Sequence, residues 1–139
     1  MSLEKWKAEF YPVDAHKATG SEIKAIEHSL RKWRGLAPSN LKKHGLTQDR
    51  DAIFETNDIT ARFDITSETC ALCERNYQYD NEEPCKTCPL FKARLGVPCF
   101  ERRPNEKQSP CCHFVKEGNA RPMAKALERT ILKLRTKKI

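Results

Sequence analysis

Two cysteine pairs are the residues of this sequence whose type and spacing indicate a chemistry most clearly. Cys70 and Cys73 form one C-x2-C unit, Cys85 and Cys88 form a second, and eleven residues separate the two units. The turn in such a unit brings two thiolates toward one point, and two units complete the tetrahedral site of a structural Zn²⁺ ion. The spacing therefore predicts zinc. An iron–sulfur centre is the main alternative, because Cys88-Pro89 resembles the end of a ferredoxin motif, but the compact cysteine run of that motif is missing.

A looser second set of possible ligands follows the two pairs. It consists of Cys99, Cys111, Cys112 and His113. In an extended segment neighbouring side chains point to opposite faces, so Cys111 and His113 could share an ion while Cys112 faces away. Cys99 could instead lie near the main site or replace one of its ligands. Additional metal ligation by Cys99, Cys111 and His113 therefore stays open beside the four-cysteine site.

Several enzymatic hypotheses fail because a required partner residue is missing. Pro84-Cys85-x-x-Cys88 matches half of the zinc deaminase signature, but no histidine is followed two residues later by the glutamate of the other half. Neither C-x2-C unit is followed by the histidine of covalent haem attachment, and there is no phosphate-binding glycine loop. A redox C-x2-C normally lies in a strand–helix–strand context, which the sequence does not predict for either pair. We therefore expect a protein that is not an enzyme.

The C-terminal segment carries most of the net positive charge. Of a formal net charge of +7, residues 118–139 contribute an excess of six, with seven basic side chains and Glu128 as the one acidic residue. The basic residues are Arg121, Lys125, Arg129, Lys133, Arg135, Lys137 and Lys138. Such a segment could bind nucleic-acid phosphates or an acidic groove on a protein. A membrane surface ranks last, because the apolar side has no Trp or Phe.

The same segment has the period of an amphipathic helix. Met123, Leu127, Ile131 and Leu134 form an apolar stripe, and basic residues follow at four-residue steps beside it. The alternative to a binding role is a solvated face on a helix that docks by its apolar side. No aromatic residue interrupts the basic side, so contact with the phosphate backbone is the form of nucleic-acid binding that it could support.

The first half of the chain must supply the scaffold for these groups. Residues 1–18 show no clean period and are interpreted as a short strand or an irregular arm. Thr19 to Glu22 has the spacing of a capping box, and apolar residues at helical intervals predict a helix that ends near Gly35. Residues 38–45 predict one further helical turn, with Ser39 as its cap and Gly45 as its left-handed stop.

Strand-like alternation begins at Ile53. A short β-hairpin is predicted from Ile53-Phe54, the polar turn that follows, and the alternation of apolar and polar residues from Ile59 to Ile65. Residues 66–117 contain five prolines and all seven cysteines, which favours loops tied to metal. We therefore predict one α+β domain over residues 1–139, with a helix and hairpin in 1–69, a zinc-binding region in 70–117 and a basic helix in 118–139.

Composition agrees with a small core that needs a cross-link or a metal. The 139 residues are 38% hydrophobic and 32% charged, respectively below and above the values of ordinary globular chains. No run approaches the roughly 18 apolar residues that span a bilayer, and no apolar run follows the first charges. We expect a cytoplasmic protein with reduced thiols, in which clustered cysteines bind metal.

Much of the chain, from about residue 23 to residue 99, resembles small cysteine-containing proteins encoded by bacteriophages and prophages. The matching tracts are His28-Ser29, Lys32-Trp33-Arg34-Gly35-Leu36, Leu41, His44-Gly45-Leu46, Cys70-Ala71-Leu72-Cys73, Cys85-Lys86-Thr87-Cys88-Pro89-Leu90 and Cys99. The resemblance implies a phage accessory protein that acts in the host cytoplasm. It supports, as the alternative to nucleic-acid binding, an inhibitor or adaptor that binds an acidic groove on a host protein.

Overall fold

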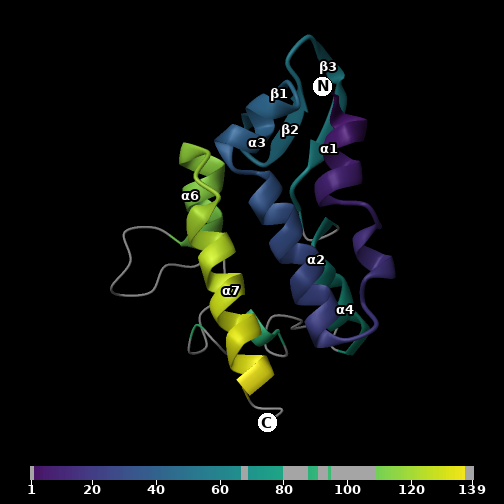
Figure 1. Ribbon diagram of the computed structural model, residues 1–139, viewed down its shortest axis with the longest axis vertical. Coiled ribbons are helices and arrows are strands. Elements are labelled where there is room, and N and C mark those ends of the chain that lie inside the picture. The colour runs from purple at the N-terminus through teal and green to yellow at the C-terminus, as the bar shows by residue number, and fades with distance from the viewer. Residues whose placement is uncertain (1, 67–68, 80–87, 91–93, 95–108, 137–139) are drawn as a thin grey trace.

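The computed structural model describes residues 2–66, 69–79, 88–90, 94 and 109–136 as an α+β protein, which confirms the predicted class (Figure 1). Its elements are α1 (Leu3–Phe10), the 3-10 helix η1 (Ala15–Lys17), α2 (Glu22–Gly35), α3 (Pro38–Lys43), β1 (Leu46–Asp49), β2 (Ala52–Glu55), β3 (Asp58–Asp64), α4 (Ala71–Tyr79), α6 (Pro110–Glu117) and α7 (Arg121–Thr136).

Helix α2 occupies the centre of the molecule and was predicted from its apolar period. It contacts α1, α3, α4 and α7, so that helices from both ends of the chain cover it (Figure 1). Its cap differs from the predicted one, because the Ser21 hydroxyl accepts the Lys24 N–H at 3.1 Å and the helix begins at Glu22. Thr19 bonds instead to the carbonyl oxygen of His16.

The N-terminal segment is helical, and the interpretation as a strand or irregular arm was wrong. The Ser2 hydroxyl accepts the Lys5 N–H and caps α1. Leu3 and Trp6 lie on the buried side of the helix, and the Trp6 indole donates to the Gly35 carbonyl at 2.8 Å. The helical spacing of the apolar residues was present but covered only two turns, too few to establish a period.

The sheet has three strands, so the predicted hairpin was incomplete. Strands β1, β2 and β3 pair antiparallel in that order, with Ile53 opposite Phe63 in the central pair. Strand β1 escaped prediction because three of its four residues are polar. Its turn into β2 places Arg50 at a φ of 55°.

The position of the helical turn after α2 was predicted correctly, but its cap residue was not. Pro38 stands at the first position of α3, where its missing N–H removes no helical hydrogen bond, and Ala37 takes the cap position that was predicted for Ser39. Gly45 has a φ of 68°, which confirms the predicted left-handed stop.

The segment predicted as metal-tied loops contains two helices among its described residues. Helix α4 begins directly after Cys70, and α6 covers Pro110–Glu117. Phe114 in α6 is fully buried, with its ring 5.1 Å from that of Trp33. Tertiary packing of this kind produces a helix that prolines and cysteines obscure in the sequence.

Helix α7 confirms the predicted C-terminal helix. Met123, Leu127 and Ile131 are buried, and the helix packs along α2 (Figure 1). Gly118, with a φ of 69°, separates it from α6.

Substitution Gly35→Ala should loosen the contact between α1 and α2. A Cβ at Gly35 would lie 2.6 Å from the Cβ of Phe10, so backbone and not only a flexible side-chain tip must move. We expect a net loss of about 1–2 kcal/mol in the free energy of unfolding, because overpacking outweighs the better helix propensity of Ala. Gly20→Ala is the control, since its nearest neighbour is Lys24 Cδ at 3.8 Å. Equal stability of both variants in chemical denaturation would contradict the prediction.

Candidate functional site

The first cysteine pair lies where a strand segment gives way to a helix. Cys70 follows β3 after a short connection, and its carbonyl oxygen accepts the Glu74 N–H at 3.0 Å, as expected of a residue that caps α4. Strand β3 therefore precedes Cys70 in the chain, and Cys73 lies in α4. Within the described part of the chain no strand follows α4, so the strand–helix–strand unit is not completed.

The Cys70 sulfur lies in surroundings that favour the thiolate. Hydrogen bonding from the Cys73 side chain lowers the pKa of the Cys70 thiol well below its usual range, against the opposing effect of burial. The positive charge of Lys32, the Cys73 backbone N–H and the Ser29 hydroxyl act in the same direction. The Ser29 Oγ lies 3.8 Å from the Cys70 Sγ. A thiolate is the form of cysteine that binds metal and attacks electrophiles.

Lys32 is a charged residue inside the protein. Its residue exposure is 1%, and its ammonium donates to the Thr69 carbonyl at 3.0 Å and lies 5.4 Å from the centre of the Trp33 ring. Sequence analysis missed Lys32 and Ser29 as members of the site. Their spacing in the sequence could have indicated that they are buried, because Ser29, Lys32 and Trp33 fall on neighbouring positions of the same helix side.

His28 on the same helix is partly buried. Its Nε2 donates to the Val13 carbonyl at 2.6 Å, and its Nδ1 is buried without a hydrogen-bond partner. Burial lowers the pKa of His28, and the neighbouring Lys32 charge acts in the same direction. The Tyr11 ring packs edge-on at 4.9 Å.

The predicted metal ligands are only partly within the described residues. Cys70, Cys73 and Cys88 are described and partly buried, whereas Cys85 and Cys99 lie outside the described residues. Among the described residues, no three side chains of His, Cys, Asp or Glu form a group that could hold a metal ion. The zinc centre therefore stays a prediction.

For the second ligand set, the backbone differs from the expectation. Cys111, Cys112 and His113 lie in α6, which is helical. The proposed sharing of an ion by Cys111 and His113 assumed an extended segment, and that premise was wrong.

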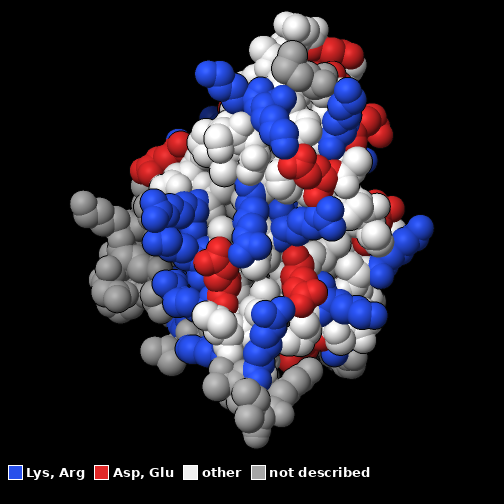
Figure 2. Space-filling view, viewed as in Figure 1, with Lys and Arg blue, Asp and Glu red and all other residues white. Residues whose placement is uncertain are grey.

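Four basic residues of α7 form a row on the surface. Arg121, Lys125, Arg129 and Lys133 are exposed, and none has an acidic partner within the ranges that the structure describes. Figure 2 shows blue side chains gathered on the side of the molecule where α7 lies. We call these four residues the α7 basic row.

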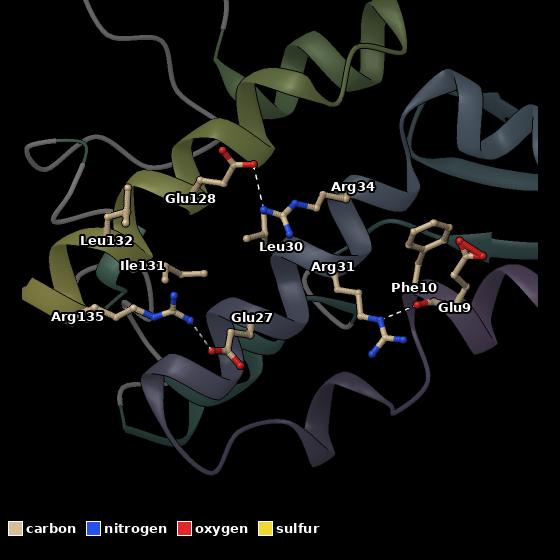
Figure 3. A pocket seen from close by; sticks show the side chains of 10 residues that line it. All are labelled: Glu9, Phe10, Glu27, Leu30, Arg31, Arg34, Glu128, Ile131, Leu132 and Arg135. Carbon is tan, nitrogen blue, oxygen red and sulfur yellow. Dashed lines mark hydrogen bonds and ion pairs between the residues drawn. The ribbon is translucent and has the colours of Figure 1, made fainter.

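Of the other predicted basic residues, the structure describes Arg135, which does not join this row. Arg135 turns toward α2 and pairs with Glu27 at 3.1 Å, and Glu128 pairs with Arg34 at 3.2 Å (Figure 3). Lys137 and Lys138 lie outside the described residues. Because Glu128 faces α2, its negative charge is paired with Arg34 at the seam between α7 and α2.

An open groove of about 620 Å³ runs along that seam (Figure 3). It is lined by Glu9, Phe10, Glu27, Leu30, Arg31, Arg34, Glu128, Ile131, Leu132 and Arg135. Leu132 is 63% exposed at its edge. The three glutamates and three arginines balance in charge, and the arginines bond to groups of the groove itself.

Comparison with known proteins does not place the chain in a family. No protein-family model, no curated protein and no solved structure matches it. None of the described helices combines the length and the apolar character needed to traverse a bilayer.

Replacement Cys70→Ser should release bound metal and unfold the region around α4. Serine has nearly the size of cysteine but supplies no thiolate ligand. At a structural zinc site the free energy of metal binding contributes to the free energy of folding, so loss of the ion should destabilise the surrounding structure. Metal stoichiometry and far-ultraviolet circular dichroism, measured together, test this expectation. Treatment of the unmodified protein with a chelator is the control and should reproduce the loss of structure. A metal-free variant with full native structure would contradict the prediction.

Proposed function

We propose that this chain is a non-enzymatic binding protein that uses the α7 basic row to bind the phosphate backbone of nucleic acid. The observation that carries the proposal is the row itself, in which Arg121, Lys125, Arg129 and Lys133 are exposed and have no acidic partner among the described residues. A charge run on a surface helix is often neutralised by its neighbours. Here the neutralising contacts lie at the α2 seam instead, where Glu128 and Arg135 are engaged.

The dimensions of the row suit a nucleic-acid strand. Lys133 lies twelve positions after Arg121, which gives a length of about 18 Å at 1.5 Å per residue. At an axial rise of about 3.4 Å per nucleotide, this length matches about five phosphates on one strand. The four basic residues carry no interleaved aromatic ring for base stacking, so we expect binding with little sequence preference and strong salt dependence.

A metal centre is the second part of the proposal. Cys70, Cys73, Cys85 and Cys88 would hold Zn²⁺, and the low pKa of the Cys70 thiol supports ligation by a thiolate. The ion would stabilise the segment between α4 and α6 and leave no catalytic role to the site. Reduced thiols suit a cytoplasmic location.

Charge reversal of the basic row should weaken nucleic-acid binding and flatten its salt dependence. The test variant carries Glu at Arg121, Lys125 and Arg129, and binding to labelled duplex DNA and single-stranded RNA is measured across a salt series. Loss of three phosphate contacts should reduce the slope of log K against log salt by about 3 for DNA.

The matched control reverses three exposed lysines elsewhere, Lys5, Lys17 and Lys24, and therefore has the same net charge. We expect it to keep most of the salt dependence. Equal losses in both triple variants would show an effect of net charge and remove the α7 basic row from the mechanism.

The second candidate function is binding to an acidic surface of another protein. Leu132 favours it, because a leucine that is 63% exposed beside the row offers an apolar contact that phosphates do not need. The resemblance to phage proteins suggests a host protein as the partner. Substitution Leu132→Ser should then leave nucleic-acid affinity unchanged and reduce capture of one specific host protein in the presence of nuclease. Unchanged capture by the variant would count against this candidate.

A further inference from the structure

One arginine of the groove at the α2–α7 seam has no acidic partner in the part of the chain that the structure describes. The other two arginines of the lining pair with glutamates at 3.2 and 3.1 Å. Arg31 instead donates its Nε–H to the uncharged carbonyl oxygen of Glu9 at 2.5 Å (Figure 3). Arg31 therefore brings to the groove a positive charge that no described carboxylate pairs with.

The Glu9 carboxylate does not compete for Arg31, because other basic residues bind it. It pairs with Lys43 at 3.1 Å and with His44 at 3.3 Å. Figure 3 shows the two terminal nitrogens of the Arg31 guanidinium pointing away from its bond to Glu9. These nitrogens carry N–H donors in one plane, a geometry that binds a carboxylate or a phosphate through two parallel hydrogen bonds. Since Arg31 is exposed, this fork is open to an external anion.

The charge of the whole groove decides between a phosphate backbone and a single carboxylate. Three glutamates and three arginines line it, so its formal charges cancel. A nucleic-acid strand brings a negative charge about every 3.4 Å, and several of its phosphates would meet the glutamates as well as Arg31. An isolated carboxylate needs Arg31 alone. The groove therefore favours an anion with a single charge, in contrast to the α7 basic row.

The floor of the groove is apolar. Leu30 and Ile131 line it and are only 6% and 5% exposed, while Leu132 stands exposed at its edge. The volume of about 620 Å³ falls within the range of about 300–1,000 Å³ that is usual for ligand sites. Arginine beside apolar surface is also typical of the residues that contribute most to protein–protein binding. An apolar side chain bound next to the carboxylate could thus be buried in the groove.

We propose that this groove binds a segment of a partner protein that carries one carboxylate beside a large aliphatic or aromatic side chain. The carboxylate accepts hydrogen bonds from both terminal nitrogens of Arg31, and the apolar side chain packs on Leu30, Ile131 and Leu132. Such docking specifies the partner of the second candidate function. It needs neither the metal centre nor the α7 basic row.

A library of displayed random peptides, selected on the immobilised full-length protein, supplies the probe. Heparin is present in excess to occupy the α7 basic row, since the balanced charge of the groove disfavours a polyanion. We expect the enriched peptides to share an Asp or Glu close in sequence to a Leu, Ile, Phe or Trp. Enriched peptides without a shared carboxylate, or no enrichment at all, would overturn the proposal.

A double-mutant cycle with the tightest of these peptides locates the carboxylate. Arg31→Met removes the guanidinium, and a second peptide has the amide in place of the acid. Each change alone should lower the affinity by about 10- to 100-fold, as expected for hydrogen bonds between charged groups. Both changes together should cost no more than either alone, because they remove the same interaction. Additive losses, or an unchanged affinity of Arg31→Met, would contradict the proposal.

Two further variants complete the test. Lys24→Met removes an exposed charge of α2 that does not line the groove, and it should change the affinity by less than about twofold because of ionic screening. Leu132→Ala serves if Arg31→Met does not fold, and loss of its apolar contact should lower the affinity by about 3- to 10-fold. Unchanged affinity of Leu132→Ala would remove the groove as the peptide site. Neither Arg31→Met nor Leu132→Ala alters the α7 basic row, so nucleic-acid binding by the row stands or fails independently.

Discussion

The fold depends on the burial of α2, which other helices cover on most of its sides. This fourteen-residue helix has buried residues from Ala25 to Gly35, and α1, α3, α4 and α7 all contact it. A chain with a modest apolar content builds one core by packing both ends of the sequence around a single helix. The consequence is that polar positions of α2 also end inside, and Ser29 and Lys32 are buried because of where they fall on that helix.

The packing of α7 on α2 decides which of its charges face water. Ile131 and Leu127 are buried, and Glu128 and Arg135 bond to Arg34 and Glu27 across the seam. Surface ion pairs of this kind add little stability, so the burial of Leu127 and Ile131 is what sets the rotation of the helix. In this arrangement the four side chains of the α7 basic row are exposed to solvent. The apolar docking of α7 and its exposed charge are therefore two results of one packing arrangement.

Prediction from sequence succeeded where a local signal was long or stereochemically specific. The apolar periods of α2 and α7 cover several turns, and Gly45 marks a left-handed stop that few other residues adopt without strain. It failed for α1 and β1, which are short, and for α4 and α6, which lie among cysteines and prolines. In α6 the deciding interaction is the burial of Phe114 against Trp33, a contact between residues 81 positions apart that no local pattern contains.

The same limit applies to the candidate site. Cysteine spacing identifies possible ligands because a C-x2-C unit is local, and the thiolate chemistry follows from the residue type. The groups that favour the Cys70 thiolate are of two kinds: Cys73 belongs to the motif, whereas Lys32 and Ser29 arrive from α2, about forty residues earlier in the chain. The Lys32 ammonium, which donates to the Thr69 carbonyl at 3.0 Å, and the Ser29 hydroxyl reach the first cysteine pair because α2 packs against α4. The cysteine motif is therefore visible in the sequence, whereas its polar surroundings are set by the tertiary packing of α2 on α4.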